Sequence, residues 1–256
     1  MTRAREKAFR QAASRHGRRK TGLSICEGRR CCAELMLRSP QTIEAVLVAE
    51  TCADPEIRAR CDSLSGLVET VPQNTISNLA TTENPQGILV LFRIPELHPL
   101  ENPPADPFLL VLDGLADPGN LGTILRTAWA AGLSQACLTN GTVDPYAPKT
   151  LRAGMGAQFA LELHQLHSLA DIAAKLKQWR WETLWLTVPR GGVDAFSADF
   201  TLPRSALVIG GEARGISDPT AGRTVSLPMP GDAESLNAAQ AATVFLFEAV
   251  RRQILH

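Results

Sequence analysis

The stretch Ser226-Leu-Pro-Met-Pro-Gly-Asp-Ala-Glu-Ser-Leu-Asn237 joins a short apolar run to the last helical pattern of the chain. The run from Thr224 to Leu227 is β-branched and apolar, and a loop rich in proline and glycine follows it. Ligands of open α/β sheets bind beyond the carboxyl ends of strands. The stretch therefore predicts a ligand-binding loop that carries Ser235, Leu236 and Asn237. The alternative is that Ser235 or Asn237 only caps the helix.

Two upstream segments show the same strand-to-loop arrangement. Gly210-Gly-Glu-Ala-Arg-Gly215 follows the apolar run at 206–209, and Asp117-Pro-Gly-Asn-Leu-Gly-Thr-Ile-Leu-Arg126 follows the run at 108–113. Gly122 and Arg126 are four residues apart and share a helix face other than the apolar one. Glycine lets a backbone approach a ligand, and arginine binds phosphate. Neither segment is a Walker loop or a G-x-G-x-x-G fingerprint, and a tight turn or a surface arginine is the structural alternative.

Strand-like apolar runs alternate with helical patterns along the chain. The runs lie near 45–49, 66–71, 87–92, 108–113, 135–139, 182–187, 205–209 and 224–228, and the helical patterns near 29–38, 55–63, 74–80, 120–131, 168–180 and 236–254. Strands that alternate with helices favour a mainly parallel sheet with helices on both faces. The predicted fold class is therefore α/β.

The segment 94–107 separates two parts of the chain. It contains five prolines, which neither continue a helix nor donate to a sheet ladder. We therefore expect a linker at 94–107 between a smaller N-terminal α/β domain, 1–93, and a larger domain, 108–256.

Positive charge is concentrated at the N-terminus although the whole chain has a formal net charge of zero. Residues 1–30 contain ten lysines and arginines and two glutamates. Such a basic segment favours contact with a polyanion such as nucleic acid. A solvated, frayed terminus is the alternative.

The rest of the composition limits the classes of protein to which the chain can belong. The chain is 45% hydrophobic and 20% charged, which is typical of a globular protein, and has no apolar run long enough for a membrane span. Its basic N-terminus lacks the apolar segment of a signal peptide. The six cysteines form no C-x-x-C pair, so we expect reduced thiols, a cytoplasmic location and no metal site. His164 and His167 are interpreted as surface or packing residues.

Taken together and in this order, the three segments resemble the SpoU (TrmH) family of RNA 2′-O-ribose methyltransferases, within the SPOUT superfamily. The resemblance covers roughly residues 107–254. The matching residues are Asn120, Gly122 and Arg126 in the first motif, Gly210, Glu212 and Gly215 in the second, and Pro228, Met229, Gly231, Ser235, Leu236 and Asn237 in the third. The N-terminal part resembles the ribosomal-protein-like RNA-binding domain of this family, through Glu27-Gly28 and Pro85-Gln-Gly-Ile88.

The resemblance implies a fold and a set of ligands that composition does not show. It implies a parallel sheet whose C-terminal segment forms a trefoil knot, S-adenosylmethionine (SAM) bound in that knot, and a homodimer that completes the site. Residues 1–93 would bind the RNA substrate and residues 108–256 would form the catalytic domain. The implied SAM-binding residues are Gly210, Gly211, Leu227, Met229, Leu236 and Asn237.

The implied reaction is methyl transfer to a ribose 2′-hydroxyl of structured RNA, with rRNA favoured over tRNA. The implied catalytic residues are Arg126, Asn120, Glu212, Ser235 and Asn237. Because an arginine stays protonated near neutrality, we expect Arg126 to hold a phosphate and stabilise the developing alkoxide. A catalytically silent RNA-binding protein with the same fold and a base methyltransferase are the alternatives.

The chain departs from the family pattern at three positions. Gly211 stands where Asn, Ala or Ser is common, Gly154 where Ser is expected, and Ala238 where Val is common. None of these changes removes a polar group of the three motifs.

Overall fold

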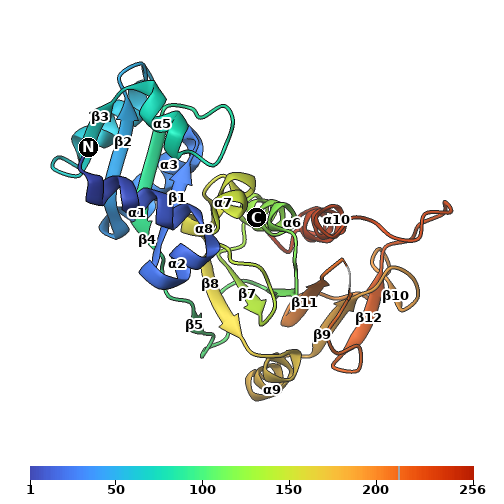
Figure 1. Ribbon diagram of the computed structural model, residues 1–256. Coiled ribbons are helices and arrows are strands. Elements are labelled where there is room, and N and C mark those ends of the chain that lie inside the picture. Colours follow the sequence, from blue (N-terminus) through green and yellow to red (C-terminus); the bar gives the residue numbers. More distant parts are fainter. Residues whose placement is uncertain (213) are drawn as a thin grey trace. The chain divides into compact units, whose positions relative to one another are not determined.

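The chain passes more than once between two structural units. The computed structural model describes residues 1–212 and 214–256 (Figure 1). Unit 1 comprises Met1–Glu96 and Asp144–Ala160, and unit 2 comprises Leu97–Val143 and Leu161–His256. The division at Glu96 falls inside the proline-rich segment, and unit 1 also takes in a stretch from the C-terminal part.

Unit 1 is built on a four-stranded sheet in the order β1-β4-β2-β3. Its strands are β1 (Leu23–Glu27), β2 (Ile43–Ala49), β3 (Val68–Val71) and β4 (Ile88–Arg93). Strand β4 is antiparallel to both β1 and β2, whereas β2 and β3 are parallel. The helices are α1 (Arg3–Ala13), α2 (Arg15–Thr21), α3 (Arg29–Arg38), α4 (Pro55–Asp62), α5 (Gln73–Leu79), α7 (Pro148–Gly154) and α8 (Ala157–Ala160), with a 3₁₀ turn, η1, at Pro40–Thr42.

The basic N-terminus forms two capped helices rather than a frayed tail. The side chains of Thr2 and Ser14 accept hydrogen bonds from the first turns of α1 and α2. Arg18 is only 7% exposed and pairs with Asp144 at 2.9 Å. These helices bury few residues, and large apolar residues, which mark a helix in a sequence, are correspondingly sparse in them.

Helices α7 and α8 belong to unit 1 because their apolar residues complete its core. The ring of Phe92 in β4 lies 5.4 Å from that of Phe159 in an edge-on contact, and Leu151 is fully buried. Local packing also explains why residue 154 is a glycine rather than the serine expected from the family pattern. A Cβ at position 154 would lie 2.4 Å from Oε1 of the buried Gln158.

Unit 2 contains an eight-stranded sheet in the order β10-β12-β9-β11-β6-β7-β8-β5, and all its strand pairs are parallel. The strands are β5 (His98–Pro99), β6 (Leu109–Asp113), β7 (Gln135–Thr139), β8 (Glu162–Leu166), β9 (Thr183–Thr187), β10 (Val193–Asp194), β11 (Ser205–Gly210) and β12 (Arg223–Ser226). The predicted fold class, a mainly parallel α/β sheet with a smaller α/β domain, is confirmed. Strand β5 lies within the proline-rich segment.

Helices cover both faces of this sheet (Figure 1). Helix α9 (Leu169–Trp179) lies on one face, and α6 (Pro118–Ala130) and α10 (Ala238–Arg251) lie on the other. Because both faces are covered, β6 and β11 are almost continuously apolar and buried. None of the described helices is long and apolar enough to span a bilayer.

Two side chains set the starts of α6 and α10. The carboxylate of Asp117 accepts a hydrogen bond from the backbone N–H of Asn120 at 2.8 Å, and Pro118 occupies the first helical position. The side chain of Asn237 caps α10. The spacing of Gly122 and Arg126 predicted that Gly122 faces away from the core. This prediction is wrong: Gly122 is buried, because α10 packs against α6.

Candidate functional site

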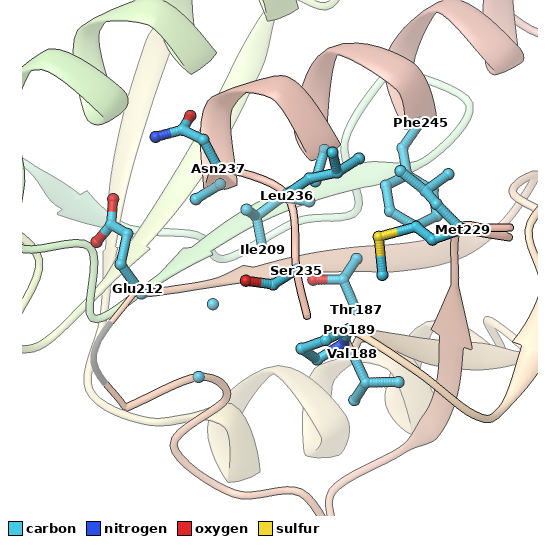
Figure 2. Close-up of a pocket in the computed structure, with 16 residues that line it drawn as sticks. Thr187, Val188, Pro189, Ile209, Glu212, Met229, Ser235, Leu236, Asn237 and Phe245 are labelled. Carbon is cyan, nitrogen blue, oxygen red and sulfur yellow. The ribbon is translucent and has the colours of Figure 1, made fainter. Parts of the chain in front are cut away.

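A cavity of about 290 Å³ opens at the carboxyl-terminal edge of the unit 2 sheet (Figure 2). Its walls come from the ends of β9, β11 and β12 and from the first turns of α10. Parallel strands bring their carboxyl ends to one edge, and this is where α/β sheets bind ligands. In Figure 2, Glu212 and Asn237 lie at one end of the cavity and Met229 and Phe245 at the other.

The walls of this cavity are largely apolar and carry little charge. Leu236 is 42% exposed, and Phe245 behind it is 1% exposed. The apolar wall also includes Val188, Ile209, Leu227 and Met229. Among the described lining residues there is one carboxylate, Glu212, and no lysine, arginine or histidine. The lining therefore suits a ligand that is flat, apolar and neutral or cationic, and it does not suit a polyphosphate.

A chain of hydrogen bonds links the three motif segments beside the cavity. The Asn237 amide nitrogen donates to the Asn120 side-chain oxygen at 3.0 Å, and the Asn120 amide nitrogen donates to the Glu212 carboxylate. The Asn237 side-chain oxygen accepts from the backbone of Ala239 and Gln240, so the orientation of the Asn237 amide is fixed. Asn120 is thereby fixed in turn, with its oxygen toward Asn237 and its nitrogen toward Glu212.

The glycines at the end of β11 leave no room for side chains. A Cβ at Gly210 would lie 2.6 Å from the carbonyl carbon of Gly215, and one at Gly211 would lie 2.4 Å from the oxygen of Gly114. The second contact explains why Gly211 replaces the larger residues expected at this position.

Asp113 anchors the segment that follows this turn. It is 1% exposed, and its carboxylate accepts from the Ser217 amide at 2.7 Å and from the Thr139 hydroxyl at 2.7 Å. The backbone oxygen of Asp113 also accepts from the Gly211 amide at 2.9 Å. One buried aspartate thus fixes both ends of the turn at the cavity.

The loop between β12 and α10 is held from the β9 side. The guanidinium of Arg190 donates to the Ala233 carbonyl at 2.9 Å and to the Gly231 carbonyl at 3.4 Å. These bonds connect the loop that carries Ser235 and Leu236 to the segment after Thr187. They give this loop a defined path although it has no regular secondary structure.

Most of the predicted site residues meet at this cavity. The residues that line it are Gly210, Gly211, Glu212, Leu227, Met229, Ser235, Leu236 and Asn237. Asn120 joins them through its hydrogen bonds. Arg126 does not line the cavity; it is exposed on α6 and forms no ion pair or hydrogen bond with the described residues.

Sequence reasoning missed two parts of the lining. Thr187 ends β9, and Val188 and Pro189 follow it, so the rule that ligands bind beyond strand ends would have found them. Ala241 and Phe245 lie on the inward face of α10, where their apolar character indicates only packing.

Comparison with known proteins gives matches over both parts of the chain. The model of the SpoU rRNA Methylase family matches residues 107–247. The model for RNA 2′-O ribose methyltransferase substrate binding matches residues 25–98. These matches cover the regions in which the sequence resemblance was recognised.

Three similar proteins illustrate the range of the similarity. An uncharacterized tRNA/rRNA methyltransferase of Synechocystis is 37% identical over 72% of this chain and 67% of its own length. The Bacillus subtilis 23S rRNA (guanosine(2553)-2′-O)-methyltransferase is 30% identical over 94% of both chains.

The third is the crystal structure of the SpoU methyltransferase AviRb from Streptomyces viridochromogenes in complex with AdoMet. It superposes with a TM-score of 0.83 at 27% identity, over 98% of this chain and 99% of that one. The chain spans only about half the length of several mitochondrial rRNA methyltransferase relatives.

Proposed function

Because the chain belongs to the SpoU rRNA methylase family, we propose that it transfers a methyl group from SAM to a ribose 2′-hydroxyl of rRNA. The observation that carries the proposal is the cavity of unit 2, whose described lining residues include no cation, with the Asn237–Asn120–Glu212 chain at one end. It combines a place for an apolar, positively charged cofactor with polar groups that can orient a hydroxyl.

The cavity lining fits SAM in its apolar character and in its charge. When bound, SAM supplies an activated methyl group on a positively charged sulfur. We propose that Leu227 and Leu236 cover the adenine, and that backbone groups of Gly210, Leu227 and Leu236 bind its polar edge and the ribose. Gly211, Met229 and Asn237 complete the wall. A site without cationic side chains avoids repulsion of the sulfonium, which would be strong in a low-dielectric cavity.

The polar end of the cavity orients the attacking hydroxyl. A ribose 2′-hydroxyl is a weak nucleophile, so positioning must supply much of the acceleration, and well-oriented groups contribute about 7–11 kcal/mol. We propose that Asn120, Glu212 and Ser235 hold the hydroxyl in line with the methyl group. We propose that the guanidinium of Arg126, a cationic fork of hydrogen-bond donors, binds the neighbouring phosphate and stabilises the developing alkoxide.

A homodimer explains why Arg126 lies outside the cavity of its own chain. Arg126 is exposed on α6, and the neighbouring helix α10 presents Phe247 with 49% of its surface exposed. Phe247 shares a helix stripe with Gln240 and Arg251, which are also exposed. We propose that this face binds a second copy and that Arg126 of one protomer serves the cavity of its partner.

Other features complete the proposal. The six cysteines are free and buried, which suits the reducing cytoplasm. We propose that the C-terminal segment forms the trefoil knot that the family resemblance implies, which fits the parallel sheet of unit 2. The catalytically silent alternative is disfavoured because Asn120, Glu212 and Asn237 keep a connected network that RNA binding alone does not require.

Two measurements test this function. Saturating SAM should raise the melting temperature of the wild-type chain, since a ligand that binds only the folded state stabilises it. Labelled SAM should then methylate an rRNA pool rather than a tRNA pool, and alkaline hydrolysis should map the product to a 2′-O-methylated nucleotide. A melting temperature unmoved by SAM, or a product methylated on a base, would contradict the proposal.

Variants of Arg126 test the homodimer. Arg126→Ala should leave SAM binding near the wild-type value and lower single-turnover methylation by at least about 100-fold. Mixing this variant with one that cannot bind SAM, such as Leu236→Arg, should restore activity, because one site of the mixed dimer keeps both an intact cavity and an intact Arg126. If mixing restores nothing although mixed dimers form, Arg126 acts within its own chain.

A further inference from the structure

A second cavity, of about 250 Å³, lies within unit 1 and contains none of the SAM-site residues. It opens between the start of α3, the loop before β4 and the turn after α7, and its lining includes Gly28, Arg30, Asn84, Arg152 and Met155. We propose that this cavity binds a single unpaired nucleotide of the RNA substrate. The inference rests on the proposed function, because it identifies how that RNA is recognised.

A buried carboxylate builds the frame of this cavity. Glu27, 2% exposed at the end of β1, accepts hydrogen bonds from the Thr81 amide at 3.1 Å and the Thr82 hydroxyl at 3.2 Å. Arg152 and the Thr81 hydroxyl also donate to it. Four donors satisfy this carboxylate, so Glu27 has little capacity left for a ligand. Its role is to fix the loop after α5 and the guanidinium of Arg152 before RNA binds.

One side of the cavity has the chemistry of a phosphate site. Helix α3 has ten residues, and the residue that precedes its first turn is Gly28, which provides no capping side chain. The amide of Arg29 donates to the side chain of Gln86, but the amides of Arg30 and Cys31 donate to no described residue. Free amides at a helix start attract anions. The exposed Arg30 side chain, which pairs with no described residue, adds a full positive charge.

Another part of the lining has the chemistry of a base site. Met155 ends α7 in a left-handed conformation, with φ of 48°, and stays 38% exposed. The next residue packs closely against α3, because a Cβ on Gly156 would lie 2.6 Å from the Cβ of Glu34. A non-glycine residue in this conformation is uncommon. A methionine that is 38% exposed can offer its thioether as an apolar surface. A base can stack on this surface and on the plane of the Arg152 guanidinium.

Asn84 supplies a group that can read the edge of the base. It lines the cavity, is exposed, and forms no hydrogen bond with the described residues. An amide offers both donors and an acceptor, which suits the Watson–Crick edge of an unpaired base. Single-stranded nucleotides are the part of RNA that proteins read in this way, because the bases of an A-form helix are inaccessible from its deep groove.

The charge of unit 1 favours RNA over a small neutral metabolite. Unit 1 has 16 lysines and arginines and 12 aspartates and glutamates, an excess of four positive charges. Phosphate contacts supply most of the non-specific affinity of RNA-binding proteins. A nucleotide bound here would thus belong to a longer strand whose phosphates contact this positively charged unit.

The experiment compares full-length variants in titrations with an rRNA transcript at two salt concentrations. Asn84→Ala should weaken binding by at least about five-fold without changing the salt dependence, because a base contact carries no counterion release. Arg30→Gln should weaken binding and also reduce the salt slope by about one. The control is Asn78→Ala, an exposed asparagine of α5 outside the cavity, which should bind like the wild type.

A second readout locates the RNA directly. Photocrosslinking of a transcript that contains 4-thiouridine should give adducts on peptides that include Met155 or Asn84. Wild-type affinity in both variants, or adducts found only elsewhere, would overturn the proposal. SAM-induced stabilisation should be unchanged in these variants. If the wild type binds SAM and RNA but methylates nothing, the proposed function fails while the nucleotide site is still tested by the titrations.

Discussion

Asn237 has two roles that one pair of substitutions can separate. Its side-chain oxygen caps α10 by accepting from Ala239 at 2.9 Å and from Gln240 at 3.3 Å. Its amide nitrogen donates to Asn120 at 3.0 Å and so orients the polar end of the cavity. Serine can cap a helix as well as asparagine does, but it is too short to keep the second bond. Asn237→Ser should therefore remove only the contact with Asn120, whereas Asn237→Ala removes both.

The expected magnitudes follow from these bonds. Loss of the cap costs about 1 kcal/mol, and loss of one exposed neutral hydrogen bond costs about 0.5 kcal/mol. Asn237→Ala should therefore melt roughly 3–6 °C below the wild type, and Asn237→Ser within roughly 2 °C of it. If Asn120 positions the nucleophile, both variants should lose about 10- to 100-fold in single-turnover rate, because small misplacements are costly.

The assay is a thermal melt of each variant, followed by single-turnover methylation at saturating SAM well below the melting temperature. A lower rate in Asn237→Ser without a matching loss of stability would support the positioning role. If the serine variant methylates at the wild-type rate while the alanine variant only melts earlier, Asn237 is a helix cap and the reasoning is refuted.

Three further changes probe the stability and organisation of the chain. Leu236→Arg should abolish the SAM-induced rise in melting temperature. The melting temperature without SAM should stay almost unchanged, because Leu236 is already 42% exposed. A large drop in the melting temperature without SAM would contradict this expectation. The hydrogen bond from Arg251, with the ion pair from Arg252, lowers the pKa of Glu248 from 4.5 to about 2. Glu248 thus stabilises the fold above pH 4.5, and the difference in melting temperature between wild type and Glu248→Gln should shrink as the pH falls toward 2. Deletion of residues 1–93 should leave a chain that still binds SAM. Because residues 144–160 pack in unit 1, the deletion should expose their apolar surface, and an increase in the binding of a hydrophobic dye would detect this.

Much of the fold and the site was accessible from the sequence. The strands of unit 2 are continuous apolar runs because both sheet faces are covered, and this pattern is visible in residues 109–113 and 205–209. The site loops were found because each follows such a strand and carries glycine or proline. The rule that ligands bind beyond strand ends therefore located most of the SAM-site candidates, from Gly210 to Asn237.

The remaining features depend on contacts between distant residues. Helices α1 and α2 were missed because they bury few residues and depend on caps and on ion pairs such as Arg18 with Asp144. The grouping of 144–160 with unit 1 arises from packing such as that of Phe159 on Phe92, which no local pattern encodes. The hydrogen bonds of Asn120 join residues 92 and 117 positions away. Sequence spacing alone indicates neither these bonds nor their direction.

The net charge of zero conceals a separation of charge between the two units, and this separation fits the two proposed ligands. With 16 basic and 12 acidic residues in unit 1, the remaining 10 basic and 14 acidic residues give unit 2 an excess of four negative charges. SAM carries a positive sulfur and is proposed to bind in unit 2, where no cationic side chain lines the described cavity. RNA is a polyanion, and most of its phosphates are proposed to contact the basic unit, so that only the reacting nucleotide needs to reach the cofactor cavity. Arg126 is then an exposed cation on an acidic unit, suited to binding the one phosphate beside the reacting ribose.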